Sequence, residues 1–168
     1  MPVTLLHIGI PGLLALYRPK KFDMVSGMIG SMIADLNFFL IFFGYQIHGI
    51  LHNYLAAILL AMFTFIAVLL LDKPLSKLKK ILRYTEKTNH FAIFMGAFVG
   101  TFSHVFLDSF LYHEMYPLFP YPDNPFYFER IHIPIMVVIY AVTIITTFGF
   151  IILYDKKYYK SMGWKKND

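Results

Sequence analysis

Long apolar stretches separated by short polar ones run through the whole chain. Four of them are long enough for a helix of about 20 residues to cross a bilayer; they cover residues 24–44, 50–71, 91–112 and 133–154. A fifth apolar stretch, residues 3–17, is shorter and contains Pro11 and Gly12. A membrane-spanning helix satisfies its own backbone hydrogen bonds. The pattern therefore predicts an all-α fold, a polytopic membrane helix bundle with four full transmembrane helices and a short N-terminal helix, forming one domain over residues 1–168.

The basic residues predict how this bundle is oriented. Fourteen of the 15 lysines and arginines lie in three segments, residues 18–21, 72–90 and 155–168. Basic segments next to transmembrane helices stay in the cytoplasm. We therefore expect a multi-pass protein of the cell membrane with a cytoplasmic C-terminal tail, and with residues 45–49 and 113–132 on the outer side.

Composition and charge narrow the possible partners and ligands. With 58% hydrophobic and 15% charged residues, the chain is too apolar for an ordinary soluble domain. The net charge of +5 follows the predicted topology and suits lipid headgroups, so we expect membrane lipids, and no nucleic acid, as partners. Residues 72–90 place leucines among lysines, which predicts an amphipathic helix on the cytoplasmic surface. Without cysteine, disulfides and thiolate metal sites are excluded.

The stretch from Gly96 to Asp108 carries the strongest chemical signal. Gly96, Gly100, His104 and Asp108 are four residues apart and share one face of a helix. Small residues let a second helix approach closely, and an imidazole and a carboxylate at this spacing can hold a metal ion. Ionisable groups inside a membrane span are costly and mark functional sites. The alternative is a neutral Asp108 that hydrogen-bonds His104 and joins two helices.

Two further stretches place candidate ligands at the same predicted depth. Gly27, Ser31 and Asp35 are also four residues apart, so packing this small face on the first one brings Asp35 to the outer half of the membrane. A simple hydrogen bond to a neighbouring helix is the other interpretation of Asp35. His48 and His52 are four residues apart at the outer end of residues 50–71. His52 is the better ligand, whereas His48 fits a water-exposed interfacial position at least as well.

The outer loop and the last apolar stretch are assigned supporting roles. Residues 113–132 contain four prolines and many aromatic residues, which exclude a long helix and suit either a lid over the site or a loop resting on the membrane. His113, Glu114 and His132 flank the site in sequence. Residues 133–154 are uncharged, and their threonines can hydrogen-bond their own helix, so we expect a scaffold only.

Four segments, in this order along the chain, resemble the YdjM-like family of inner-membrane proteins. They are residues 2–7, 30–37, 48–52 and 103–108. The family pattern is an early His, a Pro-Asp-x-Asp, a His-Arg-Gly-x-x-His-Ser and a Ser-His-x-x-x-Asp, and the resemblance covers about two-thirds of the chain. The chain departs from it at Ala34 in place of Pro, at Asn37 in place of the second Asp, and in the shortened His48-Gly49 block.

The resemblance implies a membrane-bound metal-dependent hydrolase. The family is distantly similar to the all-helical zinc-dependent phospholipases C, whose metals lie on His-x-x-x-Asp and His-x-x-x-Glu helices. The resemblance also helps to place residues 3–17. These residues can either lie flat on the cytoplasmic surface or insert from the outer side and end at Arg18. A family-wide early His favours insertion, because His7 then reaches the other ligands.

The complete prediction is a site for one or two divalent ions, zinc above all, in the outer half of the bilayer. Its expected ligands are His7, Asp35, His52, His104 and Asp108, a set that suits zinc or manganese better than magnesium or calcium. His48, Ser103 and His113 are the expected general-base or ligand-orienting residues.

The expected substrate is a lipid or lipid-linked phosphoester. The competing interpretations are non-enzymatic: a metal-stabilised membrane scaffold, or a metal or proton transporter. A transporter needs polar groups at several depths, whereas these candidates cluster at one.

Overall fold

The computed structural model describes residues 4–36, 51–84 and 86–160, and all regular elements within these ranges are helices. The predicted all-α class is confirmed. The longest helices are α4 (Tyr54–Leu70), α6 (His90–Ser109) and α7 (His132–Asp155). The shorter ones are α1 (Gly9–Tyr17), α2 (Met24–Ile33) and α5 (Asp72–Ile81). Single turns of other helix types are η1 (Thr4–Ile8), η2 (Ala34–Leu36), η4 (Glu129–Ile131) and η5 (Lys156–Lys160).

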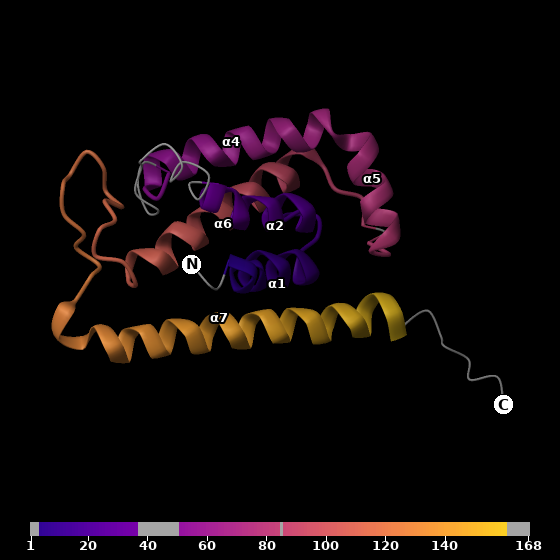
Figure 1. The fold of residues 1–168 in the computed structure, drawn as a ribbon. Coiled ribbons are helices and arrows are strands. Elements are labelled where there is room, and N and C mark those ends of the chain that lie inside the picture. The colour runs from indigo at the N-terminus through magenta and orange to yellow at the C-terminus, as the bar shows by residue number, and fades with distance from the viewer. Residues whose placement is uncertain (1–3, 37–50, 85, 161–168) are drawn as a thin grey trace.

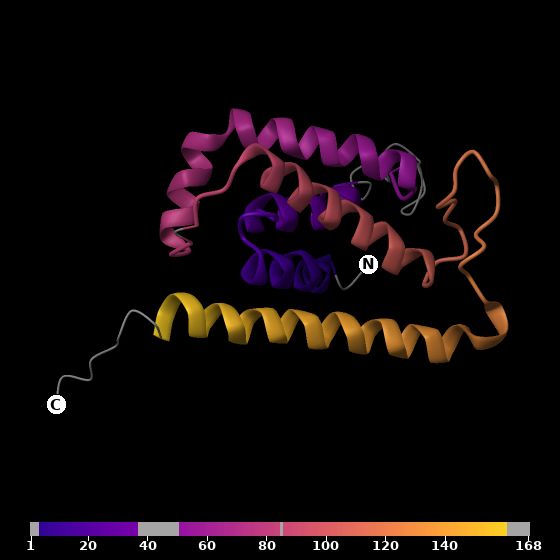
Figure 2. The same ribbon diagram turned by 180° about the vertical axis from the view of Figure 1, so that it is seen from behind.

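The helices pack in the spatial order α4, α6, α2, α1 and α7 (Figure 1). The segments rich in lysine and arginine gather at one end of this bundle, where α1 and α7 finish and α5 turns away; we call it the basic end. Residues 110–131 lie at the opposite end, as the reverse view also shows (Figure 2). Relative to the basic end, α2, α4, α6 and α7 thus run in the directions that the charge pattern predicted.

Polar caps fix where three of the helices begin. The side chains of Asp23, Asn53 and Asn89 each accept a hydrogen bond from the backbone N–H three residues later, at 2.7–2.8 Å. Asp23 is fully buried, and its second carboxylate oxygen lies 3.0 Å from Nζ of Lys79. The cap of α2 therefore also ties α5 to the bundle.

Two membrane spans are clear within the described residues, and a third depends on how a bend is counted. α6 and the helical stretch Glu129–Tyr159 are long and apolar enough to cross a bilayer, while α4 and α5 qualify only as one span bent by 84°. The expectation of four full spans is therefore supported only in part. α4 has 17 residues because the Asn53 cap delays its start. Helical structure in the first predicted span runs from Met24 to Leu36, and residues 37–44 lie outside the described residues.

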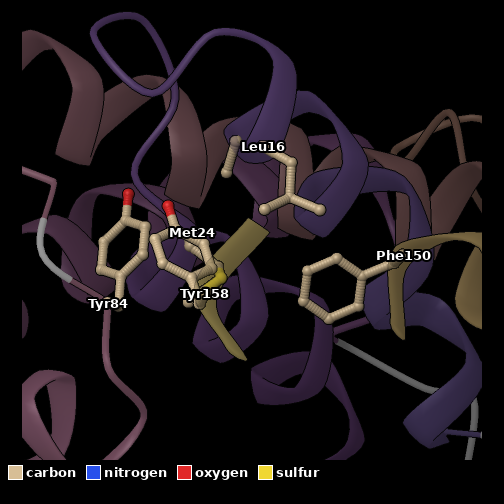
Figure 3. Close-up of a cluster of buried hydrophobic side chains, with 6 residues drawn as sticks. Leu16, Met24, Tyr84, Phe150 and Tyr158 are labelled. Carbon is tan, nitrogen blue, oxygen red and sulfur yellow. The ribbon is translucent and has the colours of Figure 1, made fainter. Parts of the chain in front are cut away.

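The predicted amphipathic segment is helical only in its first half. None of the residues of α5 is buried, in agreement with a surface helix. Arg83 adopts a φ of 55°, in the left-handed region that commonly follows a helix end. Tyr84 then enters a cluster of buried side chains at the basic end, together with Leu16, Met24, Phe150 and Tyr158 (Figure 3).

Residues 113–128 fold back against the ends of α4 and α6. The Pro117 carbonyl accepts a hydrogen bond of 2.9 Å from the Tyr54 N–H. The Asn124 side-chain amide donates to the carbonyls of Ser109 and Tyr112, both at 2.8 Å, and so satisfies the end of α6. Met115 is fully buried against α4 and α6. These bonds hold the loop on the bundle, and no long helix forms in it, as its prolines predicted.

Candidate metal centre

Four side chains from three separate segments converge at the end of the bundle opposite the basic end. Asp35 lies in η2, His52 precedes α4 by two residues, and His104 and Asp108 lie one turn apart near the end of α6. One ligand atom from each lies within 4.8 Å of all the others, and all but Asp35 are buried. The predicted convergence of Asp35 with His104 and Asp108 is present in the structure.

Four of the distances between these atoms lie near the edge length of a tetrahedral metal site, and the others are longer or bounded only by 4.8 Å. Bonds of about 2.0–2.2 Å to a central zinc ion place neighbouring ligand atoms about 3.3–3.6 Å apart. Nε2 of His104 lies 3.3 Å from Oδ2 of Asp108, 3.4 Å from Nε2 of His52 and 3.5 Å from Oδ1 of Asp35. Nε2 of His52 lies 3.6 Å from Oδ1 of Asp35 and 3.9 Å from Oδ2 of Asp108. The donor set, two imidazole nitrogens and two carboxylate oxygens, also suits zinc.

The backbone of α2 fixes the tautomer of His104. Nδ1 of His104 lies 2.7 Å from the Ser31 carbonyl oxygen, which can only accept a hydrogen bond. Nδ1 therefore carries the proton, and in the neutral ring the lone pair of Nε2 points at His52, Asp35 and Asp108. Metal-bound histidines typically donate their other ring N–H to a carbonyl or carboxylate oxygen in this way. Without a cation or an added proton, these lone pairs would repel one another.

The glycines of α2 and α6 make this hydrogen bond possible. A Cβ on Gly100 would collide with the Gly27 carbonyl oxygen and would lie 2.8 Å from the Ser31 backbone nitrogen. A Cβ on Gly30 would lie 2.6 Å from the Ala97 carbonyl oxygen. Only glycine therefore allows the two backbones to approach so closely, and the approach brings the Ser31 carbonyl within reach of His104.

His7 lies beside the four-residue group and contacts its other side. Nε2 of His7 is 3.5 Å from Oδ1 of Asp108, the oxygen that faces away from His52 and His104, and the rings of His7 and His104 have centroids 4.5 Å apart. Residues 4–17 run with His7 at the site and Arg18 at the basic end. This is the arrangement that insertion of the N-terminal segment from the site end requires.

Two of the three predicted catalytic residues, Ser103 and His113, lie outside the four-residue group. Ser103 donates a hydrogen bond to the Gly100 carbonyl and lines an apolar hollow with Tyr54, Phe102 and Phe106. His113 is 75% exposed and lies 3.0 Å from Glu114. His48 lies outside the described residues. Their roles in catalysis remain predictions.

The sequence did not predict one contact that holds the segment carrying His7. The hydroxyl of Thr147 on α7 donates a hydrogen bond of 2.7 Å to the carbonyl of Leu6, next to His7. The expectation that the threonines of this helix bond only their own backbone holds for Thr143 and Thr146, but it is wrong for Thr147. A buried threonine in an otherwise apolar span is the signal that could have suggested a partner outside the helix.

Comparison with known proteins agrees with the resemblance seen in the sequence. The family model described as "YdjM inner membrane protein" matches residues 4–165, nearly the whole chain. Comparisons with curated proteins and with solved structures find no match. The chain therefore belongs to the YdjM inner membrane protein family.

Proposed function

We propose that this protein is a membrane-embedded, metal-dependent hydrolase. The observation that carries the proposal is the set of four ligand atoms that lie within 4.8 Å of one another, three of them on buried residues, in a helix bundle of an inner-membrane protein family. Burying carboxylates costs free energy unless a cation or a hydrogen-bonding partner compensates their charge. Asp35, His52, His104 and Asp108 would hold the ion, and His7 would orient Asp108 from its free side.

The protein residues then have distinct tasks around the ion. A divalent ion, when bound, supplies Lewis acidity and lowers the pKa of its water towards 7. Ser31 keeps His104 in the metal-binding tautomer through its backbone carbonyl. Among the described residues, His7 lies against Asp108 and outside the four-atom group, so it is the histidine that we assign to accept a proton.

The finer topology is part of the same proposal. We place the basic end in the cytoplasm, the C-terminus included, with residues 24–44 and 50–71 completing four crossings. The centre then lies in the outer half of the membrane. A lipid or lipid-linked phosphoester in the outer leaflet is the substrate class that reaches such a site most directly.

A hydrolysis assay on the protein in lipid nanodiscs tests this function. Nitrophenyl phosphate esters and phosphatidic acid serve as probes, with zinc or manganese supplied. We expect turnover in the wild type and its loss in His104→Ala and Asp108→Asn, whereas Asp155→Asn, an exposed carboxylate at the other end of the bundle, retains it. Wild-type protein with full metal occupancy and no turnover of phosphate or carboxylate esters would contradict the hydrolase and favour a metal-stabilised scaffold.

A further inference from the structure

The basic end contains an apolar groove between the last turns of α1 and α7. Its walls are formed by Leu16, Tyr17 and Leu153, and Lys156 and Lys157 complete its lining. Its volume is about 320 Å³. Tyr17 is 75% exposed beside it, as aromatic residues at the level of lipid headgroups commonly are. The groove therefore combines an apolar interior with a cationic rim.

The two lysines at the rim are not equivalent. Lys157 already has partners within the protein. Its ammonium lies 2.8 Å from Oε1 of Glu86 and 3.3 Å from the Leu16 carbonyl oxygen. The hydrogen bond from Lys157 lowers the pKa of Glu86, so this pair is charged on both sides. Lys156 is exposed, and Arg18, also exposed, follows Tyr17 directly. The charged residues that line the groove are thus both lysines, and Lys156 is the exposed one.

A second groove on the other side of α7 provides a contrast within the same molecule. It has a volume of about 300 Å³ and apolar walls that include Met28, Phe150 and Ile151, but its charged lining residue is Asp155. The two grooves are alike in size and apolar character, but the charged side chains that line them differ in sign. Charge therefore distinguishes which amphiphile each one can accept.

We propose that the groove between α1 and α7 binds one anionic glycerophospholipid, with an acyl chain along Leu16, Tyr17 and Leu153 and the phosphate at Lys156. Basic pockets between membrane helices at a headgroup level recognise anionic lipids, and each basic side chain there contributes about 1 kcal/mol. The lysine stem can extend along the apolar wall while its ammonium meets the phosphate. This binding site lies at the end of the bundle opposite the metal centre and does not depend on the proposed hydrolase activity.

Native mass spectrometry of the purified full-length protein tests the proposal, with palmitoyl-oleoyl phosphatidylglycerol and the matching phosphatidylcholine as probes. We expect one phosphatidylglycerol to bind more tightly than phosphatidylcholine. Lys156→Ala should weaken phosphatidylglycerol binding about fivefold, and Leu153→Trp, which fills the groove, should abolish the preference. Matched controls are Lys73→Ala, an exposed lysine on α5, and Ile151→Trp, which fills the acidic groove; both should bind as the wild type does.

Equal binding of the two lipids by the wild type would overturn the proposal. The same loss in Lys73→Ala as in Lys156→Ala would overturn it as well, because the preference would then be a general effect of net charge. Retention of the preference in Leu153→Trp would show that the lipid does not occupy this groove.

Discussion

A backbone hydrogen bond fixes the orientation of the His104 ring in the candidate metal centre. Its Nδ1 is held by the Ser31 carbonyl, so its Nε2 is directed at two carboxylates and a second imidazole. A hydrogen-bonded His–Asp pair that only joins two helices needs one carboxylate and one imidazole. Here two carboxylates and three imidazoles lie together, which favours a bound cation over a neutral pair.

Thr147 is expected to act on the centre through His7. Thr147→Val removes the hydrogen bond to the Leu6 carbonyl, at a cost of about 1 kcal/mol, and frees η1 to move away from Asp108. We expect metal affinity, measured by competition with a chelator, to fall about tenfold. Thr147→Ser keeps the hydroxyl and should restore affinity.

Thr146→Val is the matched control for this experiment. The Thr146 hydroxyl bonds carbonyls of its own helix, so its loss should leave metal affinity unchanged. An equal loss of affinity in both threonine variants would show that α7 acts only through general stability.

Residue spacing in the sequence was sufficient to group the candidate ligands but not to find the contacts that support them. His104 and Asp108 share a face by the four-residue period, and the matched small faces brought Asp35 to them. The Ser31 carbonyl is a backbone group and leaves no trace in residue type. The same period turns Ser103 by about 100° from His104, so the spacing argued against a place for Ser103 at the centre, and the prediction followed the family motif instead.

The contact between α2 and α6 positions the centre at the level of whole helices. Gly100→Ala would place a methyl group against the Gly27 carbonyl and the Ser31 nitrogen. We expect the free energy of unfolding to fall by about 1–3 kcal/mol, with a loss of metal affinity because the Ser31 carbonyl moves away from His104. Thermal melting and chelator competition measure the two effects.

Gly149→Ala provides the control within the same chain. A Cβ at Gly149 meets no atom within 4 Å, and alanine favours a helix over glycine by up to about 1 kcal/mol. We expect equal or slightly higher stability and unchanged metal binding. If Gly100→Ala is as harmless as Gly149→Ala, the close approach of α2 and α6 does not support the site.

Helix positions were predicted better than helix lengths. Apolar runs gave α6 and α7 almost completely, because nothing in those runs interrupts a helix. The predicted span 50–71 starts later in the structure, because the Asn53 side chain caps the helix at Tyr54. Residues 72–90 form a helix only to Ile81, because the chain reverses at Arg83 to bring Tyr84 into the buried cluster. Such tertiary contacts are not visible in a hydropathy pattern.

At the scale of the whole molecule, the basic end and the candidate metal centre lie at opposite ends of the bundle. The chain lacks cysteine, so single cysteines introduced at exposed positions can report the side of each end. We expect Asp123→Cys to react with a membrane-impermeant maleimide in intact cells and Lys87→Cys to react only after permeabilisation. The reverse pattern would place the metal centre towards the cytoplasm and remove the argument for an outer-leaflet substrate.

The metal content of the purified protein tests the central claim most directly. We expect about one tightly held divalent ion per wild-type chain, and a lower melting temperature after chelation, because an ion that binds only the folded state stabilises it. Asp108→Asn should lose the ion and the chelator effect together, whereas Asp155→Asn should keep both. A wild-type protein that carries no divalent ion, and whose melting temperature neither chelator nor added zinc or manganese changes, would contradict the account and leave the histidines and carboxylates as hydrogen-bonded contacts between helices.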